Sequence, residues 1–582
     1  MDDALTAYFP QAAEPASGGV PRLMPPTTIV NGSTVYLLLG QYVAAGSVPA
    51  NGSSAPYTEL LLAKVAFDSS AKLSAQTRQI QWADAYSLWP YFPTTIYYRS
   101  IVEVVGGGGT GVVLDDGTLT FPVQARKADG TVVSLVLQSR RPEEAWELSW
   151  GTTVSGCSNP AIAEWDRKYG TLYMVTSCDE GFYRVVRSRY WGEEWVDEDV
   201  VLSRVWGTSR ARRGNGVRSG FVVATIGGKK LMLLTTPVYS EGKDGKAQGR
   251  LHLWLTDRGR VYDVGPISAA EEDAAASSLL YKSDKDGELI SVYERRKKTG
   301  EESYSLVSLH LAEQLEQVKS VVKGWTALDT ALQSCKTSGN LDPQGRGMCS
   351  GPLPTEGLVG FLSGKSTGGK WEDEYLCVNA TVHGATTKFT NGVTFSGAGA
   401  GAEWPVGKLG QNQPYYFANN KFALAVTVTI HAVPEKDGGP IPLLRVKMDD
   451  AASTVLFELS YNHERKWLSK PHRGASEESL EQWEPNQTYQ VTLQLETNDC
   501  YVYVDGSKIY HGTHDGSIFD ASRISHFCFG ADAGGGAASS QHVTLANVLL
   551  YNDLLGEAAV QKLSDGKPIS AAGGRDGRFR RR

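Results

Sequence analysis

A few short segments of the 582-residue chain have residue types and spacings that could do chemistry. His511 and His514 are three residues apart, but they lie in a Gly-rich segment with no third ligand evident, so we predict no metal site and no cofactor. Gly106–Gly111 has the glycine content of a phosphate loop, yet no Lys-Ser/Thr pair follows it, so a turn or strand edge is predicted. The basic runs Arg210–Arg213 and Arg295–Lys298 could bind acidic glycans, and solvated loop charge is the simpler interpretation.

Cysteines and glycosylation motifs form a second group of candidates. The chain has 7 cysteines, an odd number, so at least one is unpaired within the chain. Cys335 and Cys349 flank a polar segment with Gly, Ser and Pro, and both a disulfide closing this loop and two free thiols remain open. Four Asn-x-Ser/Thr motifs would accept glycans only on the secretory route, and they begin at Asn31, Asn51, Asn379 and Asn486.

Composition and charge limit the class of protein and its partners. Hydrophobic residues make up 41% and charged residues 21%, which suits packed cores and excludes disordered, collagen-like and coiled-coil classes. At roughly 100–200 residues per domain, the length predicts two to four domains. The formal net charge of −7 gives no attraction for a phosphate backbone, so we predict no nucleic-acid partner.

Membrane and export signals would be apolar stretches along the chain or at its ends. No apolar run approaches the roughly 18 residues of a spanning helix, so no transmembrane segment is predicted. The N-terminal residues have no basic region followed by an apolar one, which predicts no signal peptide in the chain as given. Arg580–Arg582 end the chain without the hydrophobic tail of a lipid-anchor signal.

The elements that must position these residues are mostly strands. Residues 28 to 310 form a succession of short apolar runs separated by turn signals, which predicts a β-meander. The segment Ser139–Trp146 is echoed by Ser188–Trp195, 49 residues further on. A period of about 40–50 residues is typical of four-stranded propeller blades, although two copies alone leave chance similarity as an alternative.

The pattern changes after residue 309. From Leu311 to Leu332 apolar residues fall mostly three or four apart, which predicts an amphipathic helix. Strands resume from about residue 357 to 552, for example Phe422–Thr429 and Tyr501–Gly506. This second β region indicates a jelly-roll or lectin-like sandwich.

Long segments of the chain resemble the trypanosomal trans-sialidase superfamily, from about residue 26 to 552. The similar segments are Leu202–Gly207, Arg250–Asp257, Gly357–Ser363, Trp371–Tyr375 and above all Val543–Asn552, which is close to the superfamily's C-terminal signature. The resemblance implies an all-β fold: a six-bladed sialidase-type propeller whose first blade is incomplete, a connecting α-helix, and a concanavalin A-like lectin sandwich. The Ser139 and Ser188 segments would then be eroded Asp boxes, because neither keeps the Asp two residues after the Ser.

The resemblance also implies domain boundaries. They are an unassigned segment 1–21, a propeller 22–310, a connecting helix and loop 311–349, a lectin-like domain 350–560, and a flexible basic tail 561–582.

A retaining sialidase needs an arginine triad for the substrate carboxylate, a tyrosine nucleophile with its glutamate, and an aspartate acid/base. By the resemblance, these positions hold other residues. The glutamate is replaced by Asn159, the nucleophile by Ala276, two triad arginines by Ser177 and Gln248, and the aspartate before Pro26 by Pro25. The first arginine's segment has no counterpart in residues 1–21, and Lys246 stands where an aromatic residue would contact the acceptor sugar.

Two further positions, Arg22 and Glu294, match the family's pocket and are interpreted as relics or as members of a structural ion pair. The replacements predict no catalytic residues and no sialidase or trans-sialidase activity. The resemblance implies a cell-surface or secreted adhesin or decoy that binds host glycans, sialylated or galactosyl ones among them, or host surface and matrix proteins. The alternatives are weak retained sialic acid hydrolysis or transfer, and a truncated gene product with an open propeller edge.

Overall fold

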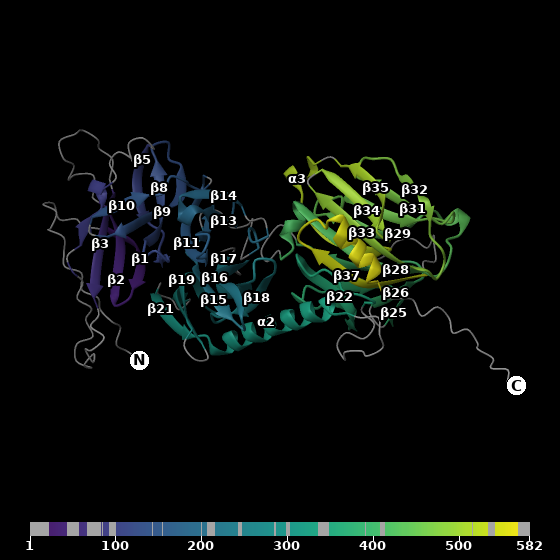
Figure 1. Ribbon diagram of the computed structural model, residues 1–582, viewed down its shortest axis with the longest axis horizontal. Helices are drawn as coiled ribbons and strands as arrows, with labels where there is room; N and C mark the ends of the chain where they lie inside the picture. The colour runs from purple at the N-terminus through teal and green to yellow at the C-terminus, as the bar shows by residue number, and fades with distance from the viewer. Residues whose placement is uncertain are drawn as a thin grey trace. The chain divides into compact units, whose positions relative to one another are not determined.

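The computed structural model describes most of the chain (Figure 1). The described residues are 22–42, 58–66, 83, 85–91, 100–142, 144–153, 155–198, 201–205, 216–241, 247–283, 287–297, 303–335, 349–389, 392–407, 414–496, 498–514, 516–532 and 542–567. Residues 1–21, Asn51 and Lys246, and the side chains of Arg22 and Pro25, lie outside this description. The chain divides into two compact units, Met1–Asp257 with Asp263–Val318, and Arg258–Tyr262 with Lys319–Arg582.

The first unit is built from five mainly antiparallel sheets that follow one another along the chain, with one parallel pair, β1 and β6, in the first sheet. The first sheet has the order β4-β3-β2-β1-β6 and contains β1 (Arg22–Asn31), β2 (Thr34–Tyr42), β3 (Thr58–Ala66), β4 (Tyr86–Ser87) and β6 (Gly109–Thr110). The second contains β5 (Ile101–Gly106), β7 (Val112–Val113), β8 (Leu119–Lys127), β9 (Val132–Arg141) and β10 (Ala145–Leu148). The third contains β11 (Cys157–Asp166), β12 (Thr171–Cys178), β13 (Tyr183–Arg189) and β14 (Glu194–Glu198).

The last two sheets complete the propeller arrangement. The fourth contains β15 (Gly220–Ile226), β16 (Lys229–Glu241), β17 (Ala247–Thr256) and β18 (Val261–Pro266). The fifth contains β19 (Asp273–Lys282), β20 (Glu288–Lys297) and β21 (Ser303–His310). Single 3-10 turns are η1 (Trp89–Tyr91) and η2 (Tyr190–Gly192).

The predicted propeller is confirmed, but its blade count is corrected. Six blades were expected, whereas the described residues between β1 and β21 form five sheets of three to five strands. The short sheet is also the last one, with three strands, whereas the first has five.

The repeated Ser-to-Trp segments occupy equivalent places in successive sheets. Ser139 lies in β9 before the hairpin to β10, and Ser188 lies in β13 before the hairpin to β14. Ser139 Oγ donates a hydrogen bond to the carbonyl of Ala145 at 2.5 Å, and the buried Trp146 donates from Nε1 to Pro142 O at 2.8 Å. The serine and tryptophan therefore hold the hairpin closed, as an Asp-box turn requires.

Helix α2 (Ala312–Gln333) follows β21 directly. Its buried side chains are Leu315, Val318, Val322, Trp325 and Leu332. Their spacing of three, four and seven residues is the apolar stripe that the sequence predicted.

The second unit is one hydrogen-bonded series of sixteen strands. They are β22 (Leu358–Thr367), β23 (Lys370–Asp373), β24 (Ala380–His383), β25 (Thr386–Phe389), β26 (Gly392–Ser396), β27 (Gly401–Pro405), β28 (Lys421–Ile430), β29 (Ile441–Met448), β30 (Val455–Tyr461), β31 (Lys466–Pro471), β32 (Glu477–Gln482), β33 (Thr488–Glu496), β34 (Asp499–Val504), β35 (Ser507–Thr513), β36 (Ile524–Gly530) and β37 (His542–Tyr551). Short helices are η3 (Tyr416–Asn419), η4 (Lys436–Gly438), α3 (Ile518–Ala521) and α4 (Glu557–Asp565).

Aromatic side chains fill the space between the strands of the second unit. Phe422 of β28 and Phe527 of β36 have ring centroids 5.0 Å apart, although their strands are not neighbours in a sheet. Trp404 contacts Phe527 from β27, with centroids 6.4 Å apart. Strands distant in the pairing order therefore face each other across an aromatic core, as in a lectin-like sandwich.

Two buried charged groups organise the second unit near β23. Asp373 is 4% exposed and accepts hydrogen bonds from the backbone N–H groups of Phe361 and Leu376, both at 2.8 Å, and from Tyr415 Oη at 3.1 Å. Burial raises the pKa of this carboxyl to about 6, although the hydrogen bonds that it accepts act in the opposite direction.

Arg260 is the second of these groups. Its guanidinium donates to both carboxylate oxygens of Asp329 at 2.7 and 3.1 Å, and from Nε to Leu358 O at 2.9 Å. The side chain is 5% exposed and lies over the Tyr375 ring at 4.2 Å. Arg260 and Asp329 therefore form a bidentate ion pair, and each guanidinium nitrogen of Arg260 donates a hydrogen bond.

The C-terminal boundary of the lectin-like unit differs from the expectation of a flexible tail from residue 561. Helix α4 continues to Asp565, because Val560 and Leu563 are buried against the unit. Lys567 still makes an ion pair with Asp505 at 2.5 Å. The rest of the expected tail lies outside the described residues.

Candidate functional site

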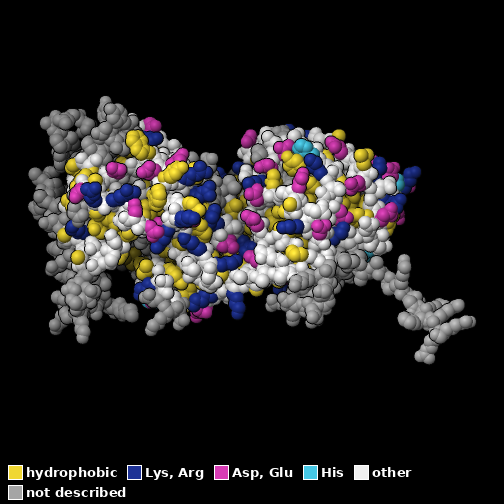
Figure 2. All heavy atoms as spheres, viewed as in Figure 1, with side chains coloured by type: hydrophobic (Ala, Val, Ile, Leu, Met, Phe, Trp, Pro, Cys, Tyr) yellow, Lys and Arg dark blue, Asp and Glu magenta, His cyan; other side chains and the backbone are white. Residues whose placement is uncertain are grey.

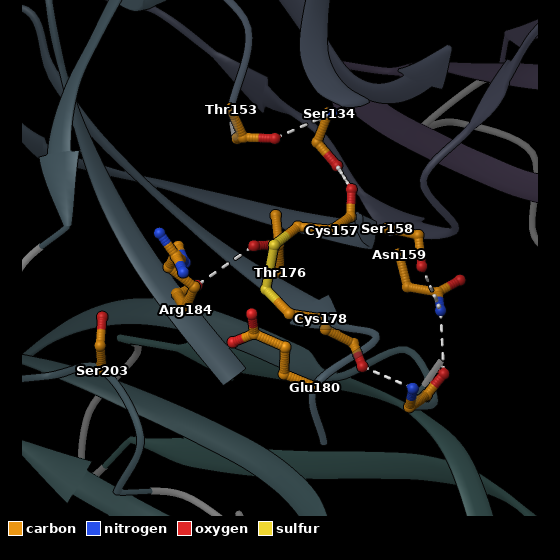
Figure 3. Close-up of a disulfide and its surroundings, with 12 residues drawn as sticks. Ser134, Thr153, Cys157, Ser158, Asn159, Thr176, Cys178, Glu180, Arg184 and Ser203 are labelled. Carbon is orange, nitrogen blue, oxygen red and sulfur yellow. Dashed lines mark hydrogen bonds between the residues drawn. A yellow bond between two sulfur atoms is a disulfide. The ribbon is translucent and has the colours of Figure 1, made fainter. Parts of the chain in front are cut away.

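The third sheet brings together two of the positions at which the resemblance expects catalytic groups. Cys157 of β11 and Cys178 of β12 form a disulfide with a Cα separation of 4.1 Å (Figure 3). In the strand register, Cys157 pairs with Cys178 and Ser158 pairs with Ser177. The disulfide therefore fixes Asn159 and Ser177 at the ends of adjacent strands.

Both of these side chains are bonded to the same backbone residue, Gly216. Asn159 has a left-handed backbone, with φ of 53°, and its Nδ2 donates to Gly216 O at 2.9 Å. Ser177 is fully buried, and its Oγ accepts a hydrogen bond from Gly216 N at 2.5 Å. A carboxamide and a hydroxyl do not gain or lose protons near neutral pH, so this pair offers neither an acid nor a base.

Two more of the expected positions lie on the fourth and fifth sheets. Gln248 of β17 donates from Nε2 to the carbonyls of Ala270 and Glu272, at 3.2 and 2.9 Å. Ala276 of β19 has only a methyl group, and the next residue, Ser277, bonds to Thr235 Oγ1 at 2.9 Å. Gln248 thus serves as a link between backbone segments, and Ala276 contributes no polar group.

Arg218 is a residue of this region that the sequence did not single out. Its side chain crosses Gly108, whose φ is 77°, and a Cβ at that glycine would overlap Arg218 Cδ. Burial lowers the pKa of the Arg218 guanidinium, and the Glu294 carboxylate acts in the opposite direction. Glu294, expected to be a relic or part of an ion pair, therefore lies within electrostatic range of a half-buried cation. No motif in the sequence marks Arg218.

The Gly106–Gly111 segment, predicted to be a turn or strand edge, joins β5 to β6 and β7. Besides the contact at Gly108, a Cβ at Gly107 would collide with Pro160 of β11, and one at Gly111 would collide with Ile29 of β1. The glycines permit this segment to lie against three different sheets.

A buried tyrosine and glutamate also lie in the first unit. Tyr293 donates to Glu272 Oε2 at 2.6 Å, and Arg295 donates to Glu272 Oε1 at 2.5 Å. Burial acts to raise the pKa of Glu272, but these hydrogen bonds outweigh it, and the pKa lies below its ordinary value. Burial and the bond to Glu272 raise the pKa of Tyr293 well above its usual range.

These two groups are chemically the pair that a sialidase uses as nucleophile and base. Tyr293 is 2% exposed and Glu272 is 8% exposed, so neither is accessible to a sugar ring. A raised tyrosine pKa also makes the phenolate harder to form. The trio with Arg295 is therefore a structural network, which also assigns a role to one arginine of the basic run at 295–298.

The glycosylation motifs lie in different surroundings. Asn31 is exposed at the turn between β1 and β2, and Asn486 is exposed with its Oδ1 3.0 Å from His431 Nδ1. Asn379 is half-buried, and its Oδ1 accepts from Asp373 N at 2.9 Å.

The remaining candidates are cysteines and histidines. Cys335 and Cys349 form the second disulfide, while Cys377, Cys500 and Cys528 are free thiols. His511 stacks on Tyr501, and His514 packs edge-on against Phe519.

The described part of the chain has neither a metal-binding cluster nor a membrane-spanning helix. It holds no group of three His, Cys, Asp or Glu side chains arranged to bind a metal ion. None of its helices combines the length and apolar character needed to cross a membrane. On the face shown in Figure 2, basic, acidic and hydrophobic side chains are interspersed.

A sheet propeller followed by an aromatic-cored β-sandwich is the architecture of a sialidase-type protein with a lectin-like domain. Residues 10–294 match the family model of the BNR repeat-like domain, and residues 354–558 match that of the trans-sialidase C-terminal domain. The chain belongs to the trypanosomal sialidase and trans-sialidase family.

Individual relatives agree with this assignment. A sialidase of Trypanosoma cruzi is 33% identical over 544 residues, 92% of this chain and 45% of the relative's own length. Sialidase 85-1.1 of the same organism is 32% identical over 565 residues, 94% of this chain and 70% of the relative. The structure of Trypanosoma rangeli sialidase in complex with sialic acid has a TM-score of 0.80 and 35% identity, with 94% of this chain and 84% of that chain covered.

Proposed function

We propose that this protein is a non-catalytic member of the family that binds host glycans or host surface proteins, as a cell-surface or secreted adhesin or decoy. The observation that carries the proposal is the shared bonding of Asn159 and Ser177 to Gly216. At both positions the resemblance expects a charged group, and both are occupied by short neutral side chains whose polar atoms already have backbone partners. A missing base or nucleophile typically lowers the rate of an enzyme by about 10²–10⁴-fold.

The chemistry that remains suits binding better than cleavage. Arg218 and Glu294 supply a cation and an anion, which can orient a polar ligand. The tyrosine and glutamate that could form a nucleophile pair are buried in another network. The chain therefore keeps groups that recognise a ligand and lacks an exposed pair that would attack it, within the described residues.

A second candidate function is weak sialic acid hydrolysis or transfer. It is favoured by the relatives, which are named sialidases and are 32–33% identical to this chain. It requires groups that act in place of the five replaced positions.

The deciding experiment is an assay of the purified full chain with a fluorogenic sialoside, and of sialic acid transfer to a galactosyl acceptor. We expect no release and no transfer above the signal of buffer. Release that a sialidase inhibitor abolishes would contradict the proposal and support the second candidate.

A glycan array and a panel of host matrix proteins then ask what the full chain binds. Arg218→Ala should weaken ligand binding, whereas Arg167→Ala, at a side chain 69% exposed on the surface, is the matched control and should not. An array and a panel without any bound ligand would contradict the adhesin proposal, independently of the enzyme assay.

A further inference from the structure

One end of the third sheet carries a group of exposed aromatic side chains. Tyr169 lies at the turn between β11 and β12, whereas Tyr190 and Trp191 lie in η2, between β13 and β14 (Figure 1). Trp150 follows β10 in the chain. The exposed fractions are 78% for Trp150, 66% for Tyr169, 61% for Tyr190 and 41% for Trp191. We call these four residues the aromatic rim.

Backbone hydrogen bonds join the three segments of the aromatic rim. Trp191 N donates to Gly170 O at 3.0 Å, which connects the β13–β14 turn to the β11–β12 turn. Gly151 N donates to Glu193 O at 2.8 Å, which brings the segment after β10 against the start of β14. The four rings therefore belong to one continuous part of the surface.

Two residues of the aromatic rim have a backbone conformation that aromatic residues rarely adopt. Tyr190 has a φ of 53° and Trp191 has a φ of 57°, both in the left-handed region. Glycine, asparagine and aspartate are the residues tolerated there, because larger side chains clash with the backbone. The equivalent positions of the preceding hairpin hold Arg141 and Pro142, neither of which has a positive φ. The turn thus keeps two aromatic side chains at a cost in stability, which indicates a use for their rings.

Gly170 fixes the orientation of the Trp191 indole. A Cβ built on Gly170 would lie almost equally close to Cε2, Cδ2 and Nε1 of that ring, inside van der Waals contact. A point at equal distances from three such atoms lies above the face of the ring, so one face of the indole rests on the backbone of Gly170. The opposite face is then available to a ligand. A ring held in this way loses little conformational freedom when a ligand stacks on it.

Charged side chains are interspersed with the rings. The exposed charged residues that flank the rings in the chain, and that make no ion pair with another described residue, are Lys168, Arg189, Glu193 and Glu194. Lys168 Nζ lies 5.1 Å from the ring centroid of Tyr169. Two cations and two anions leave the aromatic rim without net charge, and its four members include no aliphatic side chain.

This mixture suits a sugar better than a protein partner. The core of a protein–protein interface is depleted of charged residues, because their burial is costly. A pyranose has a C–H face that stacks on an aromatic ring, and its hydroxyl groups form hydrogen bonds with carboxylate and guanidinium groups beside the ring. The absence of net charge favours a sugar without a carboxylate over an acidic sugar.

We propose that the aromatic rim is a binding site for neutral hexopyranose units of a glycan. Trp191 is the stacking ring, and Arg189 and Glu193 are the groups that bond to the sugar hydroxyls. The site is separate from the Cys157–Cys178 pair and its neighbours, because the β11–β12 turn is at the opposite end of these two strands. It therefore does not depend on whether that other region binds or cleaves a ligand.

The test is a titration of the full chain by saturation-transfer NMR, with lactose, N-acetyllactosamine and mannotriose as neutral probes and sialyllactose as the acidic probe. Wild type should bind at least one neutral probe, with a dissociation constant on the order of 1 mM, as expected for a small ligand on an exposed site. Trp191→Asn should weaken this binding by roughly three- to tenfold, the loss expected for one stacking ring.

Asparagine separates a ligand contact from a structural role, because it tolerates the left-handed backbone. Trp191→Asn should therefore unfold in urea at a midpoint no lower than that of wild type. Gly170→Asn keeps the backbone conformation in the same way, but its side chain would displace the Trp191 ring, so it should weaken binding as well. Leu480→Asn, at a fully exposed leucine of β32, is the matched control and should bind as wild type does.

The possible outcomes separate this inference from the function proposed above. No binding of any neutral probe, or equal binding by wild type and Trp191→Asn, would overturn the inference. Binding of sialyllactose alone would also overturn it and leave the adhesin proposal standing. A host matrix protein that wild type binds and Trp191→Asn does not, without sugar binding, would overturn it too and make the aromatic rim a protein-docking surface. Neutral-sugar binding at the rim together with sialic acid release would support the inference and contradict the non-catalytic proposal.

Discussion

The disulfide between Cys157 and Cys178 permits a quantitative prediction for the candidate site. Changing both cysteines to alanine removes a cross-link between residues separated by 21 positions. In the chain-entropy account, a loop of this length contributes about 3 kcal/mol at 25 °C by restricting the unfolded chain. Both residues are also buried in a cluster with Phe182, so the lost sulfur contacts add to the destabilisation.

The second disulfide provides the matched comparison. Cys335 and Cys349 are separated by 14 positions, and because the entropy depends on the logarithm of loop length, their removal is also expected to lower the unfolding free energy by about 3 kcal/mol. These two cysteines are half-buried. The difference between the two double variants therefore measures what the buried sulfurs of the first pair contribute.

The assay is urea unfolding followed by tryptophan fluorescence, with hydrogen exchange of β11 and β12 to assign the transition of the first unit. Wild type should lose stability in reductant, whereas the Cys157→Ala, Cys178→Ala variant should not respond at its β11 and β12 amides. A loss below about 1 kcal/mol, in a protein whose disulfide is verified by mass, would refute the entropic reasoning.

Two further predictions concern buried charges of the second unit. Arg260→Ala should lower the unfolding free energy of that unit by about 3–5 kcal/mol, because Asp329 keeps a buried charge without its bidentate partner. Adding Asp329→Asn to the Arg260→Ala variant should recover part of this loss, and urea unfolding measures both changes. Because burial raises the pKa of Asp373 to about 6 from 3.8, the folded state binds a proton more readily than the unfolded state, so the unfolding free energy is highest below pH 4 and falls through pH 6. The fall should be roughly 3 kcal/mol and absent in Asp373→Asn, and a stability that rises over this pH range in wild type would contradict the assignment.

The architecture was predictable because its signals are local and repeated. Alternating apolar residues give the strands, the Ser139 and Ser188 segments give the hairpin period, and the spacing from Leu311 to Leu332 gives helix α2. The number of sheets was not predictable in this way, because the expectation of six came from resemblance and not from the strands themselves. The number of sheets depends on how all the strands between residues 22 and 310 pair with one another.

The candidate site shows a similar limit. Short motifs beside Cys157 and Cys178 indicated Asn159 and Ser177, but their common partner, Gly216, lies 39 residues beyond Ser177 and belongs to no motif. Arg218 was equally invisible, because an arginine before a strand has no distinctive spacing. Partners that are distant in the sequence and belong to no motif are revealed only by the fold.

The close approach of Arg218 to Gly108 means that the size of residue 108 decides where the positive charge of Arg218 can lie. Because a single methyl group at residue 108 would occupy the path of the arginine side chain, Gly108→Ala would displace a positive charge without altering any charged residue. The field near Glu294 would then become more negative, and ligands with an anionic group would be disfavoured. The position of this positive charge is therefore encoded partly in the absence of a side chain at residue 108.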